Sequence, residues 1–140
     1  MGSNCKFLVI DDNEIDRLIT SRLLSSGGMT DVHTVNGGLE GLNWIKQHVA
    51  NIGQNLVVLV DIMMPGMDGF QFMEAFDTLD ASVKRITQVF MLSSTLDPRD
   101  IKRAASNKTV KDLLSKPLPV AKLSAAVYGH ESVGVESVRR

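Results

Sequence analysis

The feature that most constrains the fold is an unbroken apolar run, LVVLV at residues 56–60, which ends directly in an acid, Asp61. A strand with apolar side chains on both faces is typical of a parallel sheet that helices cover on both sides. The residues that follow, IMMPGMDG, include the proline, glycines and aspartate of a turn. The run therefore predicts a central buried strand that delivers one carboxylate to the end of a sheet.

Short apolar runs alternate with helical patterns along the rest of the chain, which predicts repeated strand–helix units. Five strands alternating with five helices favour an α/β fold with a doubly wound parallel sheet. The expected strands are 6–10, 32–35, 56–60, 86–92 and 110–114, and the expected helices are 14–25, 39–49, 69–79, 99–105 and 120–128.

Helical spacing also predicts which side chains of the first two helices face the sheet. In the first helix, one apolar face is expected from Ile15, Leu18, Ile19 and Leu23. In the second helix, the expected inward residues are Leu39, Leu42, Trp44 and Ile45.

The bulk composition narrows the setting in which such a fold would work. The 140 residues fit one domain, and a hydrophobic content of 44% excludes a disordered chain. A net charge of -1 gives no general attraction to nucleic acid or to an anionic membrane. The longest apolar run is far too short for a membrane span, and no secretory signal opens the chain. A single cysteine excludes an internal disulfide framework, so we expect a cytoplasmic protein.

Polar side chains stand where four of the predicted strands end: Asp11, Asp12, Asp61, Ser93 and Lys116. Sites in open parallel sheets form beyond the carboxyl ends of the strands, so these side chains are expected to meet. Each has an ordinary interpretation by itself, such as a helix cap, a turn residue or a solvated lysine. Capping needs one acid, however, and does not explain three carboxylates that converge from two strands.

Three neighbouring carboxylates need positive charge, because each pair at 4 Å costs about 4 kcal/mol at an effective dielectric constant near 20. A hard cation, Mg²⁺, suits oxygen ligands and is commonly completed by a phosphate. Lys116 would add a point charge for phosphoryl oxygens, and Ser93 would add a hydroxyl donor. A carboxylate beside such a metal can act as a nucleophile. The constellation therefore predicts phosphoryl transfer to an aspartate.

The motifs LVIDD, LVDIMMPGMDG, VFMLSS and LLSKP resemble the receiver domain of two-component response regulators, over roughly residues 5–128. The resemblance implies a flavodoxin-like (βα)5 fold with strand order 2-1-3-4-5. Residues 1–4 are then an N-terminal extension or a cloning remnant, and residues 129–140 a flexible tail too short for a DNA-binding output domain. The chain is expected to be a stand-alone receiver of the chemotaxis-regulator kind, or a receiver domain cut from a longer protein.

The resemblance implies roles in metal binding and acceptance of the phosphoryl group. Asp61 is the position that accepts the phosphoryl group in this family. Asp12 would bind Mg²⁺ directly and Asp11 mainly through water, and the backbone carbonyl of Met63 is the usual third protein ligand. Asp61 would also contact the metal.

Two further roles concern charge and switching. In the family, the lysine at position 116 pairs with the acceptor and later with the phosphoryl group, and the Lys116–Pro117 bond is often cis. Ser93 matches the hydroxyl that moves toward the phosphoryl group. Leu113 departs from the pattern, because the partner switch position is usually aromatic. This departure puts the output face in doubt but leaves the chemistry intact.

The implied partners are a sensor histidine kinase or histidine phosphotransfer protein, together with a downstream output protein, but neither nucleic acid nor a membrane. The chain would be a monomer or a phosphorylation-dependent dimer, and would modify itself with Mg²⁺ rather than turn over as an enzyme. The alternative is a receiver-like binding module that acts without phosphorylation, which Leu113 favours. A phosphatase with an aspartate nucleophile would need a second acid at position 63, where the chain has Met63.

Overall fold

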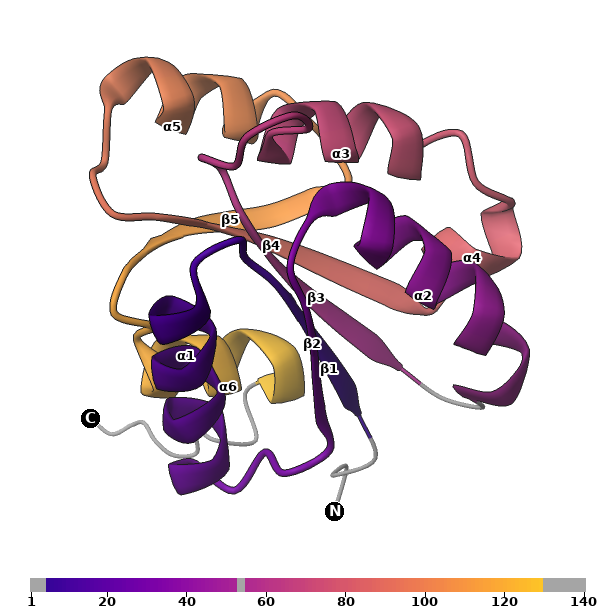
Figure 1. The fold of residues 1–140 in the computed structure, drawn as a ribbon, viewed down its shortest axis with the longest axis horizontal. Coiled ribbons are helices and arrows are strands. Elements are labelled where there is room, and N and C mark those ends of the chain that lie inside the picture. The colour runs from indigo at the N-terminus through magenta and orange to yellow at the C-terminus, as the bar shows by residue number, and fades with distance from the viewer. Residues whose placement is uncertain (1–4, 53–54, 130–140) are drawn as a thin grey trace.

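The computed structural model describes residues 5–52 and 55–129 and contains a five-stranded sheet between two layers of helices (Figure 1). The strand order is β2-β1-β3-β4-β5, and every neighbouring pair is parallel, which confirms the predicted fold class. The strands are β1 Lys6–Ile10, β2 Val32–Val35, β3 Leu56–Asp61, β4 Thr87–Ser93 and β5 Val110–Ser115. Residues 1–4 and most of the predicted tail lie outside the described residues.

The central strand β3 is buried at every position because its side chains alternate between two hydrophobic clusters. Leu56, Val58 and Val60 face one cluster, and Val57 and Leu59 face the other. Burial on both faces is the arrangement that the apolar run predicted. Pairing with β1 on one side and β4 on the other holds β3 in register and so fixes the position of the acid at its end.

The helices are α1 Glu14–Ser26, α2 Gly38–Ile52, α3 Gly69–Phe76, α4 Ala81–Arg85, α5 Pro98–Ala105 and α6 Val120–Tyr128. In Figure 1, α1 and α6 cover one face of the sheet, and α2, α3 and α5 cover the other. The prediction of a helix over 69–79 was wrong at its end, since α3 stops at Phe76. A separate short helix, α4, begins after Asp80, whose side chain accepts a hydrogen bond from the backbone N–H of Ser82.

The inward face of α1 also differs from the prediction. Its buried residues are Thr20 and Leu24, and Leu23 packs at the edge of a cluster. The other predicted inward residues are exposed: Ile15, Leu18 and Ile19. Thr20 and Leu24 lie four residues apart on one side of the helix, and this side is turned to the core in place of the predicted one.

In α2 the prediction is confirmed for Leu42 and Ile45, which are buried, and for Trp44, which packs against the same cluster. It was wrong for Leu39, which is 58% exposed. Leu39 is the second residue of α2 and lies before the part of the helix that packs on the sheet. Within the described residues, no helix is long and apolar enough to cross a membrane.

The first and last parts of the described chain meet on the α1 and α6 face. Cys5 is buried in the second hydrophobic cluster, which contains Val57 and Leu59, and Tyr128 at the end of α6 packs against that cluster. The Cys5 thiol and the Tyr128 hydroxyl also lie close enough for each to influence the pKa of the other.

Candidate functional site

Four strands deliver polar side chains to one edge of the sheet. Asp61 is the last residue of β3 and Ser93 the last of β4, while Asp11 directly follows β1. Lys116 follows β5, and its backbone N–H donates to the carbonyl of Ser93 at 2.8 Å. Since the sheet is entirely parallel, the carboxyl ends of these strands lie at the same edge, as the sequence predicted.

Three carboxylates gather at this edge. Asp11 and Asp61 are buried and Asp12 is exposed, and one oxygen from each lies within 4.8 Å of the others. Three acids with so little solvent around two of them form an oxygen donor set of the kind that a hard divalent cation fits. Met63 lies beside Asp61 and donates its backbone N–H to Asp61 Oδ1 at 3.3 Å. The use of the Met63 carbonyl as a ligand stays a prediction.

Lys116 supplies the positive charge within the carboxylate group. Its Nζ lies 2.8 Å from Asp11 Oδ2, 2.8 Å from Asp16 Oδ2 and 3.4 Å from Asp61 Oδ2. Burial alone would lower the pKa of Lys116, but its hydrogen bonds to Asp11 and Asp16 outweigh burial and raise that pKa. The side chain is therefore a charged ammonium that several carboxylates share. The Lys116–Pro117 peptide bond is cis.

Burial dominates the electrostatics of Asp61. It raises the pKa of this carboxyl from 3.8 to about 6, against the opposing attraction of Lys116, and the charge of Asp11 raises it further. A carboxylate whose charge is poorly solvated gains much from a nearby cation. The site therefore suits Asp61 to chemistry in which positive charge arrives beside it.

Asp16 belongs to the site although the sequence analysis did not select it. It comes from the first turn of α1 and not from a strand end. Helical spacing did not relate it to the acids at the strand ends, because Asp12 precedes Asn13, the residue that caps α1. Arg17, the next residue, donates to the backbone carbonyl of Asp11 at 2.8 Å.

The turn after Asp61 explains the motif PGMDG. Gly66 adopts a φ of 81°, a conformation that side-chain-bearing residues rarely take. Asp68 caps α3 in a capping box with Gln71, at 2.8 and 2.9 Å. A Cβ on Gly69 would lie 2.7 Å from the carbonyl oxygen of Asp61. The absence of that carbon lets α3 begin against the backbone of Asp61.

The hydroxyl of Ser93 is hydrogen-bonded within the loop that follows β4. It donates to the backbone carbonyl of Thr95, whose N–H in turn approaches Ser93 Oγ at 3.2 Å. Ser93 is nevertheless buried at the end of the strand next to Asp61.

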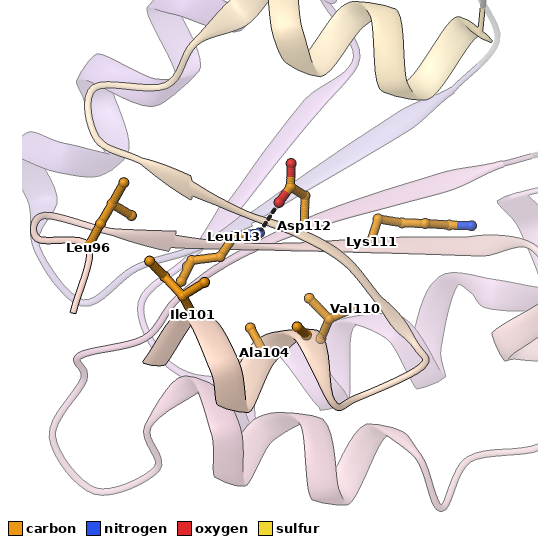
Figure 2. A pocket seen from close by; sticks show the side chains of 8 residues that line it. Leu96, Ile101, Ala104, Val110, Lys111, Asp112 and Leu113 are labelled. Atoms are coloured by element: carbon orange, nitrogen blue, oxygen red, sulfur yellow. Dashed lines mark hydrogen bonds between the residues drawn. The ribbon is translucent and has the colours of Figure 1, made fainter. Parts of the chain in front are cut away.

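Leu113 lies half-buried on β5, beside a cavity of about 340 Å³ between β5 and α5 (Figure 2). Figure 2 shows the side chain of Ile101 in α5 pointing toward Leu113. The apolar part of the lining consists of Leu96, Ile101, Ala104, Ala105, Val110 and Leu113. Leu113 thus places an aliphatic side chain at a position where the resemblance implies that an aromatic one is usual.

The parallel sheet, the acidic edge and the shared lysine together define a class of domain that is found among known proteins. The sequence matches the model of the response regulator receiver domain over residues 7–128. The chain belongs to this family, which works in two-component phosphorelays.

Two curated relatives and one solved structure illustrate the similarity. The sensory/regulatory protein RpfC of Xanthomonas campestris is 34% identical over 118 residues, which are 84% of this chain and 15% of that protein. The probable chemotaxis protein CheY of Rhizobium etli is 25% identical, over 91% of this chain and 92% of that one. A receiver protein from Dyadobacter fermentans has a TM-score of 0.81 at 30% identity, with 91% of this chain and 96% of that chain covered.

These matches identify the family. The activities of the larger relatives are properties of those proteins and are not assigned to this chain. The chain spans only 15% of the length of the first curated relatives that it matches. As a family, receiver domains bind Mg²⁺ in an acidic pocket and are generally not turnover enzymes.

Proposed function

We propose that the chain accepts a phosphoryl group on Asp61 and changes a partner-binding surface in response. The observation that carries the proposal is the meeting of Asp11, Asp12 and Asp61 with the ammonium of Lys116 at one edge of the sheet. No single cap or turn requires that arrangement. It suits a reaction in which negative charge builds up beside a carboxylate.

The proposed reaction is a displacement at phosphorus. A carboxylate oxygen of Asp61 attacks the phosphorus of a phosphohistidine or of acetyl phosphate and forms a P–O bond. The bond from phosphorus to the imidazole nitrogen, or to the acetate oxygen, breaks, and its electron pair leaves with that group. Catalysis is then mainly positioning and charge neutralisation, because the transition state of phosphoryl transfer is loose.

The residues around Asp61 would provide the neutralisation. Lys116 donates to a phosphoryl oxygen, and the rigid end of β3 holds the nucleophile in place. Asp11, Asp12, Asp61 and the Met63 carbonyl would hold Mg²⁺. The metal, when bound, supplies positive charge for the phosphoryl oxygens.

The response would begin at Ser93. Its hydroxyl now donates to Thr95, and a phosphoryl oxygen on Asp61 offers a stronger, charged acceptor. Turning toward it would draw in the loop that leads to α5, and thereby change the cavity beside Leu113. An aliphatic Leu113 would report this change by repacking and not by rotation of an aromatic ring.

The proposed donors are a sensor histidine kinase or a histidine phosphotransfer protein. The similarity to sensory and sensor proteins supports this class of donor. The proposed receiver of the signal is an output protein, bound by a monomer or by a phosphorylation-dependent dimer. A kinase-supplied phosphoryl group and one buried thiol suit the cytoplasm.

The test is intact mass after incubation with acetyl phosphate and Mg²⁺, for wild type and Asp61→Asn. We expect a single base-labile phosphoryl adduct on wild type that disappears when Mg²⁺ is chelated. Asp61→Asn should gain none while keeping its circular dichroism spectrum. An adduct on the folded Asp61→Asn protein would contradict the assignment of the acceptor.

A wild-type protein that gains no adduct, either from acetyl phosphate or from a phosphorylated histidine phosphotransfer protein, would favour the second candidate. That candidate is a receiver-like binding module which acts without phosphorylation. The feature that favours it is Leu113, since the family commonly has an aromatic residue there.

A further inference from the structure

We propose that Asp16 is a positioning residue that holds Lys116 on the α1 side of the site and so restrains phosphorylation of Asp61. This inference rests on the proposed function. It concerns a residue that lies outside the strand ends, and it predicts that loss of the Asp16 charge makes the site more reactive.

The distances show which carboxylates the ammonium of Lys116 contacts most closely. Lys116 Nζ lies 2.8 Å from both Asp11 and Asp16, but 3.4 Å from Asp61. An ammonium has three protons to donate, and the two short hydrogen bonds use two of them on carboxylates other than the acceptor. The positive charge that the reaction needs is thus held slightly away from Asp61.

The contacts of Lys116 with Asp11 and with Asp16 differ in how firmly other groups hold each carboxylate. Asp11 is fully buried, and its other carboxylate oxygen accepts from the backbone N–H of Asn13 at 3.0 Å, so Asp11 is part of the framework. The Asp16 side chain is 37% exposed, and water can replace the lysine there. Lys116 therefore releases Asp16 more readily than Asp11.

The backbone of Asp16 is nevertheless held in place. Its N–H donates to the side chain of Asn13 at 2.9 Å, at the capped start of a 13-residue helix. An acid in the first turn is favoured by the helix dipole, so a negative charge at this position is compatible with a stable helix. The helix therefore presents a fixed competitor for the ammonium of Lys116.

Phosphorylation would change this competition. Phosphorylation replaces the single negative charge of the Asp61 carboxylate with about two on the phosphoryl group, which attract the ammonium of Lys116 more strongly. The Asp16 carboxylate opposes that change twice, because it holds the ammonium and because it repels the incoming anion. Its removal is expected to speed the reaction and to lengthen the lifetime of the aspartyl phosphate.

The test compares Asp16→Asn with Glu14→Gln. Glu14 is an exposed acid in the same first turn, and among the described residues the carboxylates that pair with Lys116 are those of Asp11, Asp16 and Asp61. Both variants remove one charge from one helical turn. Only Asp16→Asn removes the charge that holds the lysine.

The readouts are the initial rate of phosphoryl incorporation from acetyl phosphate at saturating Mg²⁺, and the rate of loss after the donor is removed. We expect Asp16→Asn to react about threefold faster or more, from the loss of a like charge near the acceptor. It should also lose the phosphoryl group more slowly. Glu14→Gln should stay close to wild type, and the conservative variant Asp16→Glu should restore the slow reaction.

The outcomes separate this inference from the function on which it rests. A wild-type protein that reacts while Asp16→Asn reacts no faster would overturn the restraint alone. An equal acceleration by Glu14→Gln would also overturn it, by showing a general effect of charge. A wild-type protein that never forms an adduct would overturn the proposed function, and the restraint with it.

Discussion

Asp61 is a buried carboxylate, so its charged form is poorly solvated. Burial raises its pKa to about 6, although Lys116 lies nearby. In the unfolded chain the same group titrates near its ordinary value of 3.8, so between these two values the folded protein binds the additional proton. The free energy of unfolding therefore falls as pH rises from about 4 to about 6, and the loss persists at higher pH.

This linkage predicts the behaviour of Asp61→Asn, which cannot ionise at this position. With Mg²⁺ chelated, the variant should have a free energy of unfolding about 1–3 kcal/mol above that of wild type at about pH 8. The difference should shrink as pH falls from about 6 to about 4. Urea denaturation across that range checks the sign, and a variant that is less stable at the upper end would contradict it.

The site residues were predictable to the extent that they terminate strands. Asp11, Asp61, Ser93 and Lys116 could be selected because a parallel sheet must bring its strand ends together. Asp16 could not be selected in this way, since its place depends on the rotation of α1 about its axis. That rotation buries Thr20 and Leu24, and the apolar pattern gave the wrong face.

At the scale of elements, the corrected face of α1 predicts unequal effects of two leucines. Leu24→Ala should lower the free energy of unfolding by about 2–5 kcal/mol, because Leu24 is fully buried in the second cluster. Leu18→Ala should change it by about 0.5 kcal/mol or less, since Leu18 is 52% exposed. Urea denaturation of both variants checks this, and comparable losses would restore the face that the sequence indicated.

The junction between β3 and α3 predicts the effect of Gly69→Ala. The added Cβ would lie 2.7 Å from the carbonyl oxygen of Asp61 and 2.9 Å from Cα of Ile62, so backbone must move. We expect a loss of about 1–3 kcal/mol of stability together with slower phosphorylation. Denaturation and intact mass measure the two effects.

Gly38→Ala provides the matched control. A Cβ at Gly38 in α2 would meet the flexible side chain of Met67, whose Sδ is 2.6 Å away and can move. If Gly38→Ala slows phosphorylation as much as Gly69→Ala, the contact with the acceptor backbone is not the cause.

The elements themselves were predictable because the apolar spacing in β1 and β3 allows only burial on both faces. The extra helix α4 was not, since its five residues continue the polarity of the segment after α3. It begins at a local cap, Asp80, whose pairing with Ser82 is a short-range detail that hydrophobic periodicity does not record.

At the scale of the whole molecule, binding of Mg²⁺ to the acidic edge should stabilise the folded state. Beyond saturation, each tenfold increase in free Mg²⁺ should add about 1.4 kcal/mol to the free energy of unfolding. Asp12→Ala should shift the onset of this dependence to higher Mg²⁺ concentration, whereas Glu74→Ala, which removes an exposed acid in α3, should not. Thermal denaturation over a Mg²⁺ series checks it, and the same onset for the two variants would remove Asp12 from the metal site.

The contact between Cys5 and Tyr128 has a consequence for how this domain can be connected to other proteins. Since β1 begins and α6 ends beside each other, a short linker could join the two positions with little loop-closure entropy. Both positions also lie away from the edge where β1 delivers Asp11. The domain could be inserted into a longer polypeptide, or circularly permuted, while the edge of the sheet that carries Asp61 stays accessible to a phosphoryl donor.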